Sequence, residues 1–240
     1  LIKNYSEKDS DIAMMGYLHG YKGLLQGNSI SIGKDVMNQA KIMYEFGGSP
    51  IGNSRVKLTN VDDCVKNGFI KDDADPLEVA ADQLIKDNVT ILHTIGGDDT
   101  NTSAGDLVSY LKKNNYDLTV VGMPKTVDND IFPIKQTLGA WTAAEQGAIF
   151  FENISNENTT SSRQLIIHEI MGRKCGWLTA ATTREYRKRL ENKKFLPSLL
   201  IEKERWNVDA VYIPEMEIDV MKEANRLMEC MDKKDSVNIF

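Results

Sequence analysis

Short apolar segments typical of buried strands alternate along the chain with longer segments that carry apolar residues at helical spacing. The expected strands are residues 90–95, 118–122, 165–170 and 209–213, and the expected helices are residues 76–87, 102–113, 137–152, 176–190 and 217–231. Residues 153–162 are polar and predict a linker. This order of elements predicts an α/β fold with a largely parallel sheet, because parallel strands need long crossover connections that are usually helical.

Four of the expected strands end in turns with polar or charged side chains. The turns are Gly97-Asp98-Asp99, Lys125-Thr126-Val127-Asp128-Asn129-Asp130, Met171-Gly172-Arg173 and Pro214-Glu215. If the strands are parallel, these turns meet at one edge of the sheet, where ligands bind in open α/β folds. The carboxylates also have plainer interpretations: Asp98 or Asp99 could cap the following helix, and aspartates such as Asp128 are common in turns.

The first of these turns has the composition of a phosphate site. Gly96 and Gly97 allow the backbone to approach an anion, and the following helix start offers free N–H groups and a positive dipole end. Carboxylates beside a phosphate predict Mg²⁺, and a carboxylate apart from the metal could accept a proton from an attacking hydroxyl. Arg55, at the end of a glycine-rich loop, suits two-pronged phosphate contacts, but a surface arginine is an equally good interpretation. The residues alone indicate phosphoryl transfer.

Composition narrows the class of protein. The chain has 240 residues, enough for one large or two smaller domains. A net charge of −6 argues against a nucleic-acid partner, and no apolar run is long enough to span a membrane. Three widely spaced cysteines, Cys64, Cys175 and Cys230, predict reduced thiols and a cytoplasmic location.

The order and spacing of the four turns, together with residues 47–59, resemble the phosphofructokinase family over nearly the whole chain. Within that family the chain is similar to the pyrophosphate-dependent branch. The resemblance implies two Rossmann-like three-layer subdomains with largely parallel sheets. Residues 1–138 would bind the phosphate donor and magnesium, and residues 139–240 would bind fructose 6-phosphate. It also implies a reversible glycolytic transfer from pyrophosphate to the sugar 1-hydroxyl, by a homodimer or homotetramer.

The resemblance also implies a role for each motif residue. Asp98 and Asp130 would hold Mg²⁺, and Asp128 would accept the proton of the sugar hydroxyl. The implied catalytic residues are Asp128, Lys125, Asp99 and Thr126. The implied substrate-binding residues are Arg55, Thr126, Asp128, Asp130, Met171, Gly172, Arg173 and Glu215.

Asp99 and Lys125 bear on the choice of donor, because the resemblance implies glycine at position 99, and usually at 125, in ATP-dependent enzymes. A carboxylate at position 99 would lie where the α-phosphate of ATP must go. Two like charges ~4 Å apart repel by about 4 kcal/mol at an effective dielectric constant of ~20, roughly a thousandfold in affinity. Lys125 could offset charge on pyrophosphate in the transition state. An ATP-dependent phosphofructokinase is the alternative that these side chains disfavour.

The ends of the chain depart from the family pattern. The chain begins at Leu1, where the family's second strand is expected, and residues 1–30 do not resemble the glycine-rich loop that precedes it. It ends at Phe240, in what reads as a strand and before the family's later arginine and histidine ligands of the sugar phosphate. Gln164 stands where many relatives have a basic residue that reaches a neighbouring subunit. The chain is expected to be the middle of an enzyme, and a non-catalytic fragment or subunit is a third interpretation.

Overall fold

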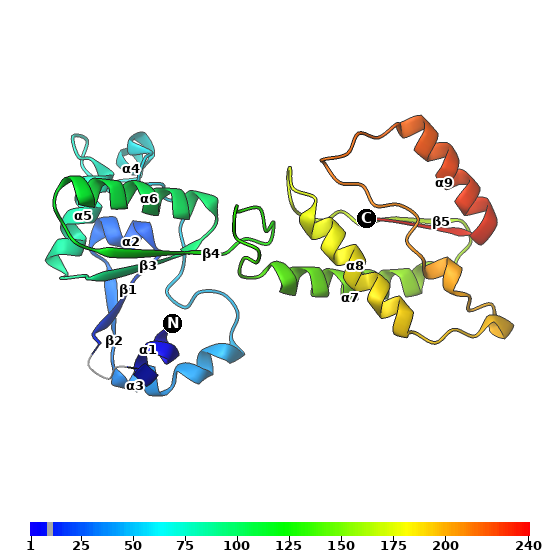
Figure 1. Ribbon diagram of the computed structural model, residues 1–240, viewed down its shortest axis with the longest axis horizontal. Helices are drawn as coiled ribbons and strands as arrows, with labels where there is room; N and C mark the ends of the chain where they lie inside the picture. Colours follow the sequence, from blue (N-terminus) through cyan, green and yellow to red (C-terminus); the bar gives the residue numbers. More distant parts are fainter. Residues whose placement is uncertain (9–11) are drawn as a thin grey trace. The chain divides into compact units, whose positions relative to one another are not determined.

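The computed structural model describes residues 1–8 and 12–240, and this part of the chain divides into two compact units, Leu1–Gly122 and Met123–Phe240. The described residues form three two-stranded sheets, one in the first unit, one that ends across the division, and one in the second unit. Helices flank these strands in each unit, so the predicted α/β class is confirmed (Figure 1).

The first unit contains the elements α1 (Ile2–Lys8), β1 (Met14–Tyr17), α2 (Tyr21–Gln26), β2 (Ser29–Ile32), α3 (Lys34–Asn38), a 3₁₀ helix (Ala40–Glu45), α4 (Val61–Lys66), α5 (Pro76–Lys86), β3 (Ile91–Gly96) and α6 (Asp98–Lys113). β4 (Thr119–Pro124) follows and ends across the division between the units. β1 and β2 form an antiparallel pair. The Thr119 N–H donates to Thr90 O (3.0 Å). The starts of β3 and β4 are therefore adjacent, and the two strands run in the same direction.

The core of the first unit forms where α2, α5 and α6 meet the β3–β4 sheet. Leucines at helical spacing, such as Leu107 and Leu111 on α6, point into it and are buried, as are Leu24 and Leu84. Figure 1 shows α6 along this sheet. This packing places the start of α6 directly at the end of β3, and so fixes the Gly-Gly-Asp-Asp turn.

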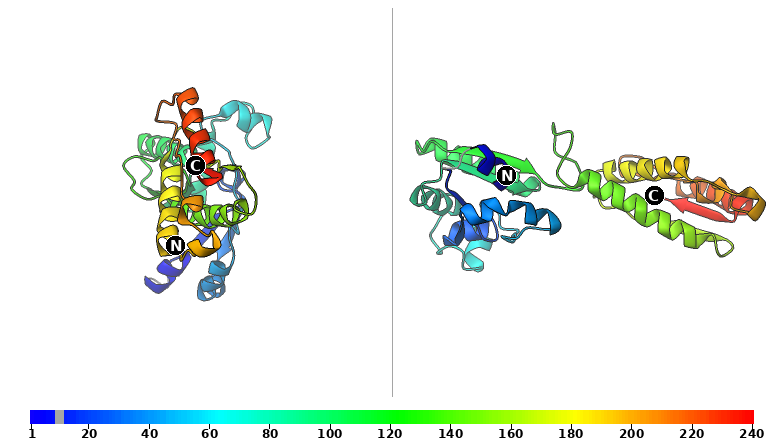
Figure 2. Two further views of the ribbon diagram at one scale, coloured as in Figure 1. Left: turned by 90° about the vertical axis from the view of Figure 1, so that its right-hand side faces the viewer. Right: turned by 90° about the horizontal axis from the view of Figure 1, so that it is seen from below.

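The second unit contains α7 (Ala140–Asn158), β5 (Gln164–Ile167), α8 (Trp177–Asn192), two 3₁₀ helices (Pro197–Leu199 and Lys203–Trp206), α9 (Val220–Lys234) and β6 (Ser236–Ile239). β5 and β6 pair in parallel, with Gln164 opposite Ser236. α7 and α8 pack against each other (Figures 1 and 2). Gly147 permits their close approach, because a Cβ there would lie 2.9 Å from Cγ2 of Thr182.

Two predictions about the second unit are wrong. Residues 209–213 do not form a continuous strand, although they lie beside β6: Ala210 makes an isolated parallel bridge with Ile239, and the Tyr212 N–H donates to Phe240 O (2.8 Å). Here the Asp209 carboxylate, instead of a backbone carbonyl, accepts the Asn238 N–H (2.8 Å). The expected linker is also helical through Asn158, because buried Ser155 faces the core and its hydroxyl lies 3.2 Å from Tyr186 Oη.

The division between the two compact units falls after Gly122, earlier in the sequence than the boundary at residue 138 that was predicted from function. The Leu138 N–H donates to Pro124 O (3.0 Å), which ties the segment after β4 to the second unit. The binding of a different substrate by each part of the chain stays a prediction. Among residues 1–8 and 12–240, no helix is both long and apolar enough to cross a membrane.

Candidate active site

The Gly96-Gly97 turn is shaped by a close approach between β3 and α6. A Cβ at Gly96 would lie 2.3 Å from Oγ1 of Thr100, so only glycine fits. The Asn101 amide Nδ2 donates to Gly96 O (3.0 Å) and Gly97 O (2.8 Å), which closes the turn from the helix side. Gly97 itself has open space where a Cβ would be. The backbone at the start of α6 is therefore accessible to an anion.

Asp98 and Asp99 are the first two residues of α6, and both are exposed. Their negative charge is favourable next to the positive end of the helix dipole. Asp99 Oδ1 lies 2.9 Å from Lys57 Nζ, in an ion pair whose side chains are 69% and 47% exposed. Lys57 was not predicted as a site residue. Its place two residues after Arg55, inside the matching segment 47–59, was the available sequence signal.

The acidic residues of this region fit a magnesium ion bound mainly through its substrate. The described residues contain no group of three side chains arranged to hold a metal. Mg²⁺ at phosphate sites needs only one or two carboxylates, because waters and phosphate oxygens complete its coordination. With Asp99 engaged by Lys57, Asp98 is the acidic side chain of this turn that remains for a cation. Asp130, the other predicted ligand, is exposed in the second unit.

The turn around Asp128 is held from several sides. The Asp128 N–H donates to Thr126 Oγ1 (3.2 Å), and the Thr137 hydroxyl donates to Thr126 O (2.5 Å). The Cys175 thiol lies 3.5 Å from Asp128 O. Val127 packs against the apolar cluster of α7 and α8. Val127 is thus fixed by its packing, and its neighbours Thr126 and Asp128 are half-buried.

The Met171-Gly172-Arg173 turn requires glycine at its centre. Gly172 has φ 153°, and a Cβ there would lie 2.2 Å from Cys175 O. The Cys175 N–H donates to Gly172 O (2.8 Å), which closes the turn. Arg173 also has a positive φ, of 52°, and its side chain is exposed, as is that of Met171. The backbone conformation therefore directs two side chains outward around a buried glycine.

Glu215 caps the helix that follows this turn. Its Oε1 accepts the Gly176 N–H (2.8 Å) at the start of α8. A Cβ at Gly176 would lie 2.6 Å from Oε2 of the same carboxylate, so glycine lets Glu215 approach. The predicted sugar contact thus has one oxygen engaged by the protein backbone.

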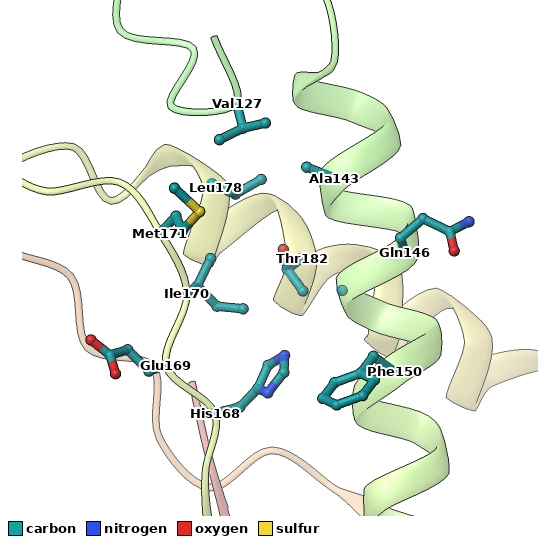
Figure 3. A pocket seen from close by; sticks show the side chains of 11 residues that line it. Val127, Ala143, Gln146, Phe150, His168, Glu169, Ile170, Met171, Leu178 and Thr182 are labelled. Atoms are coloured by element: carbon teal, nitrogen blue, oxygen red, sulfur yellow. The ribbon is translucent and has the colours of Figure 1, made fainter. Parts of the chain in front are cut away.

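Two cavities in the second unit are lined in part by Met171, Gly172 and Arg173, whereas Asp128 and Glu215 line neither of them. One, of about 310 Å³, has Val127 and Met171 at one end and His168 and Phe150 at the other (Figure 3). The other, of about 320 Å³, is lined in part by Gly172, Arg173, Cys175 and Pro214. The Asp128 turn and the Met171–Arg173 turn are therefore neighbours within one unit.

His168 lines both cavities and was not predicted as a site residue, because it lies in an apolar strand pattern typical of a core histidine. Burial lowers the pKa of His168 below its ordinary value, which favours the neutral ring. Its Nε2 is buried, and within the described part of the chain it has no hydrogen-bond partner.

The predicted site residues divide between the units. Arg55, Asp98 and Asp99 belong to the first unit, and the others belong to the second: Lys125, Thr126, Asp128, Asp130, Met171, Gly172, Arg173 and Glu215. Arg55 and Lys125 are both exposed. A single site made by both groups remains a prediction.

The sequence profile of the family described as phosphofructokinase matches residues 2–240. The chain belongs to the phosphofructokinase family. It is 60% identical over 240 residues to the pyrophosphate–fructose 6-phosphate 1-phosphotransferase of Methylomonas methanica, covering 100% of this chain and 59% of the relative. A more distant relative, the ATP-dependent 6-phosphofructokinase of Borreliella burgdorferi, is 32% identical over 170 residues, which are 70% of this chain and 34% of the relative.

Solved phosphofructokinases share the fold. The crystal structure of the pyrophosphate-dependent phosphofructokinase from Nitrosospira multiformis superposes with a TM-score of 0.72 at 17% identity, covering 99% of this chain and 54% of that one. This likeness confirms the fold, and the profile match over residues 2–240 confirms the family resemblance seen in the motifs. The chain spans about 59% of the length of the Methylomonas relative that it matches.

Proposed function

We propose that the protein containing this chain transfers a phosphoryl group from pyrophosphate to the 1-hydroxyl of fructose 6-phosphate. The observation that carries the proposal is the contact between two turns of the second unit. The thiol of Cys175, two residues after Arg173, lies 3.5 Å from Asp128 O. This contact joins the backbone of the Asp128 turn to the chain next to Arg173, so a sugar phosphate held by Arg173 would lie near the residue proposed as the proton acceptor.

The acceptor side of the reaction uses Asp128 as a general base. Asp128 takes the proton of the sugar 1-hydroxyl as that oxygen forms a bond to phosphorus. The bond from the same phosphorus to the bridging oxygen of pyrophosphate breaks, and inorganic phosphate leaves. Because Thr126 Oγ1 accepts the Asp128 N–H, its own proton is available to donate to a phosphate oxygen. Met171, Gly172 and Arg173 would bind the sugar phosphate.

Glu215 has one carboxylate oxygen on the Gly176 N–H and a second oxygen that could accept a sugar hydroxyl. The helix cap would hold this carboxylate in place before the sugar binds. Such prior orientation lowers the entropy cost of binding. Glu215 is therefore proposed as an orienting contact for the acceptor.

The donor side uses the start of α6. Asp98 and Asp130 are the proposed ligands of Mg²⁺, which when bound would neutralise charge on the phosphate oxygens. The open backbone after Gly97 and the exposed side chain of Arg55 suit the remaining phosphate oxygens.

Asp99 and Lys125 favour pyrophosphate over ATP in this proposal. A carboxylate at position 99 repels the α-phosphate of a nucleotide, whereas pyrophosphate has no phosphate there. Lys57 shares the charge of Asp99 and weakens the repulsion calculated for a bare carboxylate. The 60% identity to a pyrophosphate-dependent relative supports the same choice of donor.

We further infer a cytoplasmic homo-oligomer active in glycolysis. The cysteines at positions 64, 175 and 230 are unpaired, as expected in a reducing compartment. The oligomer rests on the family resemblance alone. Size-exclusion chromatography with light scattering would test it.

The variant Asp128→Asn tests the proposed chemistry. Asparagine keeps the shape of the side chain but cannot accept the proton, so kcat should fall about 10²–10⁴-fold. KM for fructose 6-phosphate should change little, because the sugar phosphate contacts remain. A coupled assay with pyrophosphate, then ATP, as donor measures both parameters. A variant that keeps the wild-type kcat would rule out Asp128 as the base.

A further inference from the structure

The segment between β4 and α7 is a loop closed at its base by hydrogen bonds. The Leu138 N–H donates to Pro124 O (3.0 Å), and the Thr137 N–H donates to Asn129 Oδ1 (2.8 Å). The loop tip is open to solvent, and Phe132 there is 95% exposed. The hydrogen bonds that fix this segment therefore lie where its two ends come together, a region that also contains Thr126 and Asp128.

Asn129 joins both sides of the loop through one carboxamide. Its Oδ1 accepts the Thr137 N–H, and its Nδ2 donates to Lys135 O (3.2 Å). Its backbone has φ 53°, in the left-handed region that asparagine tolerates better than most residues. Asparagine therefore meets both requirements of this position: a carboxamide that bonds in two directions and a backbone with positive φ.

Thr137, at the other end of the loop, bonds to the residues around Asp128. Its side chain is 1% exposed, and its hydroxyl donates to Thr126 O (2.5 Å) and lies 3.1 Å from Asn129 Oδ1. A buried hydroxyl in this position is costly to leave without partners. The peptide group of Thr126 is therefore fixed from inside the protein.

These bonds determine where the reacting side chains point. Thr137 holds the carbonyl of Thr126, whose Oγ1 accepts the N–H of Asp128. Asn129, the residue directly after Asp128, has the left-handed conformation, and its side chain is fixed by the Thr137 N–H and Lys135 O. Loss of either partner would let the Asp128 turn rotate, while the residues that α7, β5 and α8 contribute to the cavities remain in place.

We propose that Asn129 and Thr137 are positioning residues of the transfer reaction: they hold Asp128 and Thr126 in the orientation from which the sugar hydroxyl is deprotonated. The proposal rests on the proposed role of Asp128. A displacement of about 1 Å can cost about a hundredfold in rate, so hydrogen bonds that never touch substrate can control kcat.

Matched variants test this role in the full enzyme. Thr137→Val removes the hydroxyl and keeps the shape, and it should lower kcat about 10–100-fold with KM for fructose 6-phosphate within about threefold. Thr137→Ser keeps the hydroxyl and should retain a kcat near that of wild type. Asn129→Gly keeps access to positive φ but loses the carboxamide, so it should lower kcat in the same range, and it serves if Thr137→Val fails to fold.

A double-mutant cycle separates positioning from general loss of structure. In the Asp128→Asn background, Thr137→Val and Asn129→Gly should lower the residual rate by much less than in the wild type, because the part of their effect that acts through the Asp128 carboxylate is already lost. An equal loss of rate in both backgrounds would overturn the proposal, as would a wild-type kcat for folded Thr137→Val or Asn129→Gly. A wild-type rate for Asp128→Asn alone would instead overturn the proposed function.

Discussion

The start of α6 and the turn around Asp128 are both predicted to act in phosphoryl transfer, but their surroundings differ. Asp98 and Asp99 are exposed, and Asp99 has an exposed lysine as its ion-pair partner. Asp128 is half-buried and lies in a turn held by hydrogen bonds from Thr137 and Cys175. One region is organised by charge, and the other by fixed geometry.

This difference suits the two halves of the proposed reaction. A diphosphate is small and highly charged, so exposed charges can select it with little shape complementarity. Proton transfer from a sugar hydroxyl requires heavy atoms within hydrogen-bond reach, and therefore a carboxylate in one orientation. We expect donor preference to respond to charge, and catalytic rate to respond to backbone geometry.

A pair of glycine substitutions compares the two turns, and it has the largest expected effect on stability. Gly172→Ala places a Cβ 2.2 Å from Cys175 O at φ 153°, and should destabilise the protein by about 1–3 kcal/mol. Gly97→Ala meets open space at φ −75° and should cost less than about 1 kcal/mol, the loss of an N-cap preference. Urea unfolding of both variants measures the difference. Equal losses would contradict the contrast between an open and a closed turn.

Removal of the ion pair between Lys57 and Asp99 should have the smallest effect of these predictions, a change in KM for pyrophosphate. Lys57→Met leaves Asp99 uncompensated and should raise KM for pyrophosphate about twofold to fivefold, the range of an exposed ion pair. The effect should shrink at high ionic strength, because exposed charges are screened. Lys57→Arg, which keeps the charge, is the control. A rise in KM that does not depend on salt would indicate a geometric role and weaken the comparison.

Much of the fold could be predicted from the apolar pattern. The order β3–α6–β4 follows from two apolar runs on either side of a helical segment. The helix α6 was predicted to begin at residue 102, but it begins at Asp98. The segment predicted as a strand at residues 209–213 lies beside β6 but is not a continuous strand, because the Asp209 carboxylate takes the place of a backbone carbonyl in the pairing. The end of α7 was missed because its exposed face is as polar as a linker, while Ser155 faces the core.

The candidate site was predictable as motifs but not as contacts. Gly96 was predicted from the composition of its turn and Gly172 from the family resemblance, and the structure adds the atoms that exclude a side chain at both positions. The pairing of Lys57 with Asp99 depends on how the loop after Arg55 folds back, which local sequence does not encode. The bonds of Thr137 likewise depend on the return of the chain from the loop tip.

The double variant Asp99→Gly with Lys125→Gly tests most directly the claim that charge at the donor side selects pyrophosphate. The measurement is kcat/KM for fructose 6-phosphate phosphorylation with pyrophosphate and with ATP, in the full enzyme. Loss of the lysine should lower the pyrophosphate value about a hundredfold, and loss of the carboxylate should admit ATP as a measurable donor. Full activity with pyrophosphate and none with ATP would contradict the account.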